Sequence, residues 1–232
     1  MNGRSGPHSI VSLDPIVKKK KAKPGRFIVL DGPDGVGKTT HAKMLCAELE
    51  KRGLVVKALR EPGGTALGEA IRALLLDQTK IYIDPLAEAF LFQAARAQLI
   101  REVIRPALER GEWIVCDRFT LSTLVYQGYA GGIKKKTIKI LSDAAANGLK
   151  PDAYLVLFVP AEISAERRAI RQAGRADRME SKGDEYLDRV FKGFQKEAEQ
   201  DKNGFVLIDG RGTEQDVSKR IWSKIEALLK NR

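Results

Sequence analysis

The chain has 232 residues, of which 43% are hydrophobic and 31% are charged, a composition that suits one globular domain with a sizeable core. No apolar stretch approaches the roughly 20 residues of a membrane-spanning helix, so we expect no membrane association. Two widely spaced cysteines, Cys46 and Cys116, are predicted to be reduced core thiols of a cytoplasmic protein. His8 and His41 form no metal-ligand pattern and are expected at the surface.

The net charge of +11 is unevenly distributed. Residues 1–26 carry seven basic residues, four of them in the run Lys18–Lys21, against a single acid, and so hold about half of the excess charge. This segment has no apolar periodicity and is predicted to be a disordered basic N-terminal extension. Nucleic acid is not the expected partner, although a weak contact of the extension with it stays open. A polyphosphate substrate explains the remaining arginines equally well.

From residue 27 onward, short apolar runs alternate with helical patterns, which predicts one α/β domain over residues 27–232 with a parallel sheet covered by helices on both faces. The predicted strands are residues 27–30, 54–59, 113–116, 154–159 and 205–208. The predicted helices are residues 37–51, 67–76, 85–109, 120–128, 134–147, 184–200 and 214–229. In such sheets ligands bind at the carboxyl ends of the strands.

Residues 32–39 read GPDGVGKT and match the phosphate-loop pattern G-x-x-x-x-G-K-[ST] in full. Glycines let successive backbone N–H groups turn inward around a phosphate, and the helix that follows adds the positive end of its dipole. Lys38 is predicted to contact the outer phosphates of a nucleotide, and Thr39 to offer its hydroxyl to Mg²⁺. The predicted ATP-binding residues are Gly32, Pro33, Asp34, Gly35, Val36, Gly37, Lys38, Thr39, Thr40 and Arg167.

An acidic residue at the end of a predicted strand also supports a nucleotide site. The sequence WIVCD at residues 113–117 is an apolar strand that ends in Asp117, and such an aspartate can hold Mg²⁺ or its water shell beside the phosphate loop. The predicted metal site is therefore Thr39 with Asp117, and the predicted cofactor is Mg²⁺ bound together with ATP.

The class of phosphate-loop protein follows from what accompanies the loop. No Asn-Lys-x-Asp sequence that would read guanine is found, and a motor or transport ATPase would usually be larger. Residues 167–178 read RRAIRQAGRADR, which is typical of a mobile lid that excludes water and neutralises a transferring phosphoryl group. We expect a P-loop NTPase-type five-stranded parallel sheet with a short arginine-rich lid at about residues 168–182. A solvated basic helix face is the alternative for the lid segment.

Residues 27–232 resemble thymidylate kinases of the bacterial type. Four segments carry the resemblance in the expected order: GPDGVGKTT at 32–40, REPGGT at 60–65, FQAAR at 92–96 and DRFTLSTLVYQG at 117–128. The resemblance implies a nucleoside monophosphate kinase that transfers the γ-phosphate of ATP to dTMP, giving dTDP and ADP in dTTP synthesis. It also implies a homodimer formed through helices.

The resemblance assigns roles on the acceptor side. Asp34 would bind the 3′-hydroxyl of the sugar, and Arg60 and Arg118 would grip the acceptor phosphate through planar forks of donors. Phe92 would stack on thymine and Arg96 would hydrogen-bond a base carbonyl. The remaining residues expected near the nucleoside are Ser122, Thr123, Gln127 and, beside the sugar, Tyr126, which would disfavour a 2′-hydroxyl.

One departure from the wider family concerns the catalytic charge. Some members carry an arginine inside the phosphate loop, where this chain has Gly35 and Val36. In such cases lid arginines supply the charge, and Arg171 is the first choice, with Arg175 as the alternative. Together with Lys38, Asp117 and Arg118, Arg171 completes the predicted catalytic set. Arg167 is expected against adenine, which the backbone of residues 209–213 should also approach.

Two other functions stay open at this point. One is a nucleoside monophosphate kinase with a different base preference, which a nucleotide screen would detect. The other is a catalytically weak nucleotide-binding regulator that uses its basic extension on nucleic acid, although the intact Lys38, Thr39 and Asp117 argue against it.

Overall fold

The computed structural model describes residues 24–77, 81–172, 177–201 and 204–230, the side chains of residues 171 and 172 excepted. Most of the predicted extension, including Lys18–Lys21, lies outside this part. Two residues before the predicted boundary at residue 27 already contact the domain, since Gly25 N donates to Leu108 O at 2.8 Å and Arg26 pairs with Asp152 at 2.7 Å. The limits of the extension remain a prediction.

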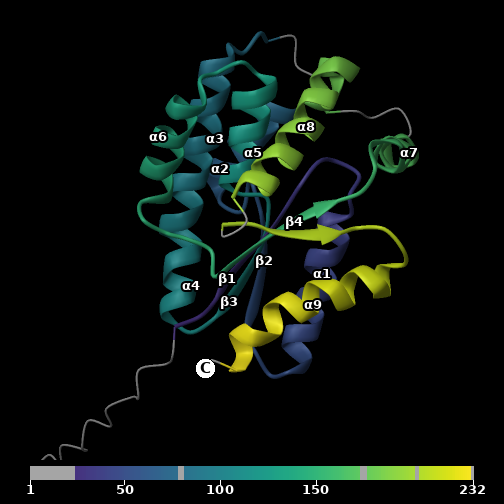
Figure 1. Cartoon of the computed structure of the whole chain (residues 1–232). Coiled ribbons are helices and arrows are strands. Elements are labelled where there is room, and N and C mark those ends of the chain that lie inside the picture. Colours follow the sequence, from purple (N-terminus) through teal and green to yellow (C-terminus); the bar gives the residue numbers. More distant parts are fainter. Residues whose placement is uncertain (1–23, 78–80, 173–176, 202–203, 231–232) are drawn as a thin grey trace, which may run out of the picture.

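A five-stranded parallel sheet forms the centre of the domain, as predicted (Figure 1). Its strand order, which was not predicted, is β2-β3-β1-β4-β5. The strands are β1 (Phe27–Asp31), β2 (Val56–Arg60), β3 (Trp113–Asp117), β4 (Ala153–Phe158) and β5 (Val206–Asp209). Within the register, Leu30 lies opposite Asp117, and Arg60 also lies opposite Asp117. The carboxyl ends of three neighbouring strands, each followed by polar residues, therefore meet at one edge of the sheet.

Helices cover both faces of the sheet (Figure 1). One layer consists of α2 (Ala66–Leu76), α3 (Pro85–Leu99), α4 (Arg105–Glu109), α5 (Thr120–Thr123), α6 (Lys135–Ala146) and α8 (Asp184–Gln200). The other consists of α1 (Lys38–Lys51), α7 (Ala161–Gln172) and α9 (Glu214–Lys230). Three shorter turns complete the described elements, namely η1 (Ile100–Ile104) and η2 (Leu124–Ala130), both π-helical, and the 3₁₀ turn η3 (Glu180–Lys182).

The alternation of side chains along β1 explains why two cores form. Phe27 and Val29 pack into the core beneath α3, α6 and α8, while Ile28 and Leu30 pack into the core beneath α1 and α9. Successive strand residues point to opposite faces of a sheet, so a strand that is apolar at every position has to be covered on both sides. Cys46 and Cys116 are buried free thiols in these cores, as predicted.

Three local features differ from the sequence-based expectations. The predicted continuous helix 85–109 is interrupted by the π-helical turn η1, which ends two residues before Pro106, a residue with no N–H group to donate. Half of the arginine-rich stretch is helical, because α7 extends to Gln172. The expectation that His41 lies at the surface is wrong: its side chain is buried against α9, with Nδ1 3.3 Å from Ser218 Oγ.

Among the described residues, no helix is both long enough and apolar enough to cross a membrane.

Candidate active site

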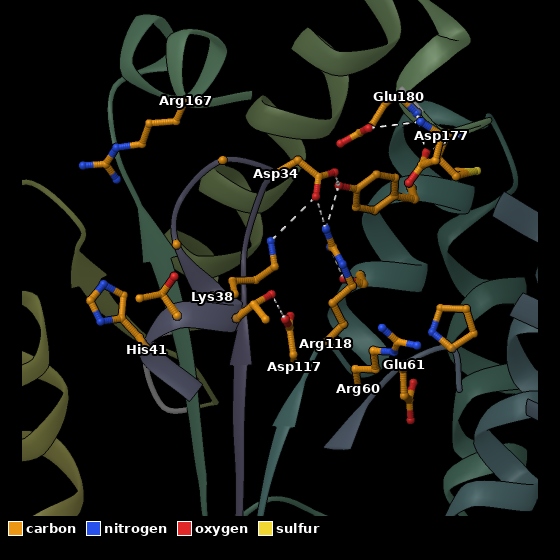
Figure 2. A pocket seen from close by; sticks show the side chains of 18 of the residues that line it. Asp34, Lys38, His41, Arg60, Glu61, Asp117, Arg118, Arg167, Asp177 and Glu180 are labelled. Atoms are coloured by element: carbon orange, nitrogen blue, oxygen red, sulfur yellow. Dashed lines mark hydrogen bonds and ion pairs between the residues drawn. The ribbon is translucent and has the colours of Figure 1, made fainter. Parts of the chain in front are cut away.

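A cavity of about 740 Å³ lies at the carboxyl ends of the strands, where the sequence placed the site (Figure 2). Arg167 and His41 lie on one side of it, Arg60 and Glu180 on the other, and Lys38, Asp117 and Arg118 between them. The predicted residues that line it are Asp34, Gly35, Gly37, Lys38, Thr39, Thr40, Arg60, Phe92, Arg96, Asp117, Arg118, Ser122, Thr123, Tyr126, Gln127 and Arg167. Gly32, Pro33 and Val36 belong to the loop but do not line the cavity.

The phosphate loop connects β1 to α1 in a conformation that only glycines allow. Gly32, Gly35 and Gly37 all have positive φ angles, and a Cβ atom on Gly32 would lie 2.3 Å from the backbone oxygen of Leu157. Gly37 precedes α1 without any side-chain cap, so the first N–H groups of the helix have no side-chain acceptor there. This is the arrangement in which a helix N-terminus binds phosphate.

Lys38 is enclosed at the mouth of α1 with only 6% of its surface exposed. Its ammonium donates to Pro33 O at 2.6 Å and lies 4.0 Å from Asp34 Oδ1. Burial, together with the positive charge of Arg118, lowers the pKa of Lys38 to about 8, against the opposing effect of the nearby carboxylates. The ammonium is therefore desolvated in the structure, and a bound anion would stabilise its charged form.

Asp117 lies beside Lys38 (Figure 2), and Thr39, the next residue of the loop, contacts it, as the metal-site prediction requires. The Thr39 hydroxyl donates to Asp117 Oδ2 at 2.6 Å, and Asp117 Oδ1 is buried without a hydrogen-bond partner. No group of three or more His, Cys, Asp or Glu side chains suitable for a metal occurs in the part of the chain that the structure describes. One carboxylate and one hydroxyl fit Mg²⁺, which usually keeps several waters and shares its ligands with substrate phosphates.

Arg118 projects into the cavity from a backbone conformation that is unusual for its type, with φ of 75°. It donates to Asp34 Oδ1 at 2.5 Å and to Ser122 Oγ at 2.9 Å. The Tyr126 hydroxyl donates to the second Asp34 oxygen at 2.5 Å. Burial opposes the charge of Arg118, but the carboxylate of Asp34 outweighs it and raises the pKa of Arg118 well above its usual value.

Asp31, the last residue of β1, holds this segment in place. Its carboxylate is fully buried and accepts hydrogen bonds from Phe119 N, from both the backbone and the hydroxyl of Ser122, and from the Tyr154 hydroxyl. It also accepts from Gly32 N at 2.9 Å. One side chain thus ties the phosphate loop to the Arg118 segment. Asp31 was not predicted as a site residue, because all but one of its partners are distant in the chain.

The base-binding end predicted on α3 is built around a buried ion pair. Phe92 is half-buried at the cavity wall, and Arg96, one helical turn later, is 2% exposed. Arg96 pairs with Glu61 at 2.6 Å and donates further hydrogen bonds to Gln93, Thr123 and Phe119 O. Burial raises the pKa of Glu61, against the stabilising charge of Arg96. Glu61 and Gln93 were not predicted as site residues. Their role depends on contacts with Arg96, which the sequence pattern around them does not indicate.

Two arginines, Arg60 and Arg167, lie on opposite sides of the cavity. Arg60 has a side chain that is 57% exposed and pairs loosely with Glu69 at 3.3 Å. Arg167 lies on α7 at the opposite side (Figure 2). Gly210, Gly212 and Thr213 also line the cavity. These glycines belong to the loop expected to approach adenine.

The predicted lid is only partly within the described residues. Arg171 is in the last turn of α7, but its side chain is outside the described part, and so is all of Arg175. Asp177, Met179 and Glu180, at the far end of the same segment, line the cavity and were not predicted as site residues. Which lid arginine supplies the catalytic charge therefore stays a prediction.

The fold and the cavity define a phosphate-loop nucleotide kinase: a parallel sheet with the loop after β1, an acidic β3 end beside it, and arginines facing it across one cavity. The sequence model of the thymidylate kinase family matches residues 30–221. The chain belongs to the thymidylate kinase family.

Individual relatives agree with the family model. A thymidylate kinase of Rhizorhabdus wittichii is 43% identical over 206 residues, covering 89% of this chain and 99% of the relative. One from Synechococcus sp. (strain JA-3-3Ab) is 41% identical over 203 residues, with 88% and 96% covered. The crystal structure of thymidylate kinase from Ehrlichia chaffeensis superposes with a TM-score of 0.69 at 29% identity, covering 87% of this chain and 99% of that one.

Proposed function

We propose that the protein transfers the γ-phosphate of ATP to dTMP, giving ADP and dTDP, and so serves dTTP synthesis. The observation that carries the proposal is the two-sided cavity. Arg167 lies on one side of the cavity and Arg60 on the other, with Lys38 and Arg118 between them (Figure 2). Phe92 and Arg96 also line it. A donor and an acceptor can therefore meet in one enclosure. Family membership supplies the identity of the two nucleotides.

On the donor side, the ATP phosphates lie on the loop Gly32–Thr39 and the Lys38 ammonium contacts the outer phosphates. The proposed residues for Mg²⁺ are Thr39 and Asp117, supported by their 2.6 Å contact and by the buried Asp117 oxygen that lacks a partner. Mg²⁺, when bound with ATP, supplies positive charge at the β- and γ-phosphates. Arg167 lies against adenine.

On the acceptor side, Arg118 and Arg60 bind the dTMP phosphate, and Phe92 and Arg96 hold the base. Asp34 accepts the 3′-hydroxyl of the sugar beside Tyr126. A phosphate oxygen of dTMP attacks the γ-phosphorus in line, the bond from that phosphorus to the β-phosphate oxygen breaks, and ADP leaves. The attacking phosphate is already largely ionised at neutral pH, so positioning and charge neutralisation supply the catalysis.

Lid closure completes the site in this proposal. Arg171 reaches the transferring phosphoryl group, with Arg175 as the alternative, because the phosphate loop has Gly35 and Val36 where another arginine would stand. Closure also excludes water, which would otherwise hydrolyse ATP.

The test is ADP release with ATP and Mg²⁺ against dTMP, dUMP, dCMP, dGMP, AMP and UMP in parallel. Strong activity on dTMP with weaker activity on dUMP is expected. Activity on another monophosphate instead would keep the kinase and overturn the base assignment. Activity on none would contradict the enzyme and favour a regulator that acts through residues 1–26.

We also propose a homodimer formed through α2, α3 and α6. These adjacent helices carry large apolar side chains that water reaches, including Leu67, Phe90 (52% exposed) and Ile140 (58% exposed). Exposed apolar surface on neighbouring elements is typical of a protein interface. The cytoplasm is the proposed location, since the buried cysteines are free thiols. Light scattering should give twice the chain mass for the wild type and the single mass for Phe90→Glu; a monomeric wild type would contradict the dimer.

A further inference from the structure

Glu88, on the first turn of α3, is a buried carboxylate that the mechanism above does not use. It is 1% exposed and accepts hydrogen bonds from three side chains of two distant segments. Gln127 Nε2 lies 2.8 Å from one carboxylate oxygen, and Lys182 Nζ lies 3.0 Å from both. Arg178 donates to the second oxygen. Two of the three donors belong to the far end of the lid segment, and the third belongs to the predicted base pocket.

The charge of Glu88 decides how the Gln127 amide is oriented. Burial opposes ionisation, but the hydrogen bond from Gln127 and the ammonium of Lys182 outweigh it, and the pKa of Glu88 is lowered. An ionised carboxylate can only accept hydrogen bonds, whereas an amide offers either a donor nitrogen or an acceptor oxygen. The nitrogen of Gln127 must therefore face Glu88, and a rotation by half a turn would set oxygen against oxygen.

With its nitrogen engaged, Gln127 has one group left for a ligand. Its side chain is 1% exposed to solvent yet lines the cavity, and within the described part of the chain no group donates to its Oε1 atom. The pocket thus presents a fixed acceptor. Thymine and uracil carry an N–H donor at ring position 3, whereas cytosine carries a lone pair there. A lone pair facing a fixed acceptor leaves two buried acceptors unpaired.

We propose that Glu88 is a specificity-positioning residue: by holding the Gln127 amide with its oxygen free, it makes the pocket accept pyrimidines with N–H at position 3 and reject 4-aminopyrimidines. The inference rests on the proposed function, since it needs the base to bind beside Gln127. Lys182 and Arg178 take part by keeping Glu88 ionised. Phe92 stacks on either ring and cannot make this distinction.

The test compares kcat/KM for dTMP, dUMP and dCMP in the wild type and in Glu88→Gln. Glutamine at position 88 can donate or accept, so Gln127 can rotate to meet cytosine. The preference for dTMP over dCMP should fall by at least about tenfold, which is roughly what one buried, unpaired acceptor costs. The preference for dTMP over dUMP should stay unchanged, because both carry the same N–H.

Two further variants separate orientation from mere structural support. Lys182→Met removes one donor to Glu88 but leaves Arg178 and Gln127, and it should keep the dTMP/dCMP preference within about twofold, since Glu88 still has a cationic partner. Gln127→Leu removes the acceptor itself and should lower the preference as Glu88→Gln does; in the double variant the two losses should not add. This variant tests the proposal even where Glu88→Gln fails to fold.

Outcomes that overturn the inference are distinct from those that overturn the function. If Glu88→Gln, or Gln127→Leu, lowers kcat/KM for dTMP and dCMP by the same factor, Glu88 supports structure only. If the wild-type protein uses none of the three nucleotides, the proposed function fails first.

Discussion

Replacing Asp31 by asparagine is the sharpest test of how the active site is held together. Asp31 Oδ1 accepts from Gly32 N at 2.9 Å and from Ser122 Oγ at 2.6 Å. Oδ2 accepts from Phe119 N at 3.1 Å, Ser122 N at 3.2 Å and the Tyr154 hydroxyl at 2.7 Å. An asparagine has one acceptor oxygen, which is best placed at the Oδ2 position because two backbone donors lie there. Its nitrogen then faces Gly32 N, while the Ser122 hydroxyl can rotate to accept.

The cost follows from these contacts. One buried, unpaired N–H group on Gly32 costs about 1–3 kcal/mol, and the other bonds weaken by about 1 kcal/mol each when their acceptor loses its charge. Burying a neutral side chain in place of a charged one returns about 2 kcal/mol of this sum. We expect a net loss of about 2–4 kcal/mol in the free energy of unfolding. For a chain of this length that corresponds to a fall in Tm of roughly 5–15 °C.

Asp152→Asn is the matched control. Asp152 also accepts from a backbone N–H, that of Phe27 at 2.8 Å, and pairs with Arg26, but its side chain is 26% exposed. Water can replace the lost bonds there, so the loss should stay below about 1 kcal/mol. Calorimetry and urea unfolding measure both variants. If Asp31→Asn melts no lower than Asp152→Asn, the carboxylate does not hold the two loops and the reasoning is refuted.

Two further predictions concern the charges that meet the phosphates. The folded pKa of Lys38, about 8, is below its ordinary value of 10.5, so the ammonium is lost earlier in the folded protein than in the unfolded chain. kcat/KM for ATP should therefore fall as pH rises through about 8. The contribution of Lys38 to the free energy of unfolding should increase between pH 8 and 10.5, because the unfolded chain binds more protons there. Lys38→Arg should flatten the pH profile, and an unchanged profile would contradict the assignment. Arg171→Ala should lower kcat by roughly 10²–10³-fold with little change in dTMP affinity; a rise in KM alone would show that Arg171 binds rather than catalyses.

The sequence predicted those parts of the site that are contiguous in the chain. The phosphate loop is a local motif whose glycines, lysine and threonine act within one turn, and Asp117 follows directly from an apolar strand. The meeting of the strand ends at one edge then follows from general rules for parallel sheets, whereas the order of the strands was not predicted.

The buried carboxylates could not be predicted in the same way. Glu61 and Glu88 become site residues only because Arg96, Gln127 and Arg178 reach them across the fold. A single acid in a strand end or a helix reads as a surface residue until its partner is known. Likewise residues 168–172 were assigned to the lid from their charges, and the sequence did not predict that they form the last part of α7.

The ion pairs of the site differ in how much of their side chains is exposed. The buried pair is rigid, whereas the more exposed pairs can exchange a carboxylate for a ligand. Arg96 and Glu61 are 2% and 5% exposed, so a ligand cannot replace Glu61 without leaving a buried charge unpaired. Arg118 and Asp34 are 19% and 15% exposed, and Arg60 and Glu69 are 57% and 48% exposed. A phosphate can displace these carboxylates, because water and the sugar hydroxyl can take the place of the arginine.

Under the proposed assignment, the base end is fixed before the nucleotide binds, and Asp34 balances the charge of Arg118 until the acceptor phosphate replaces it. This division matches the demands of each end. Discrimination between bases needs donors and acceptors that cannot rotate, whereas phosphoryl transfer needs cations that follow a phosphate as its charge moves. In the proposed mechanism Asp34 has two successive partners, Arg118 in the free protein and the sugar in the complex, so release of Arg118 becomes part of acceptor binding.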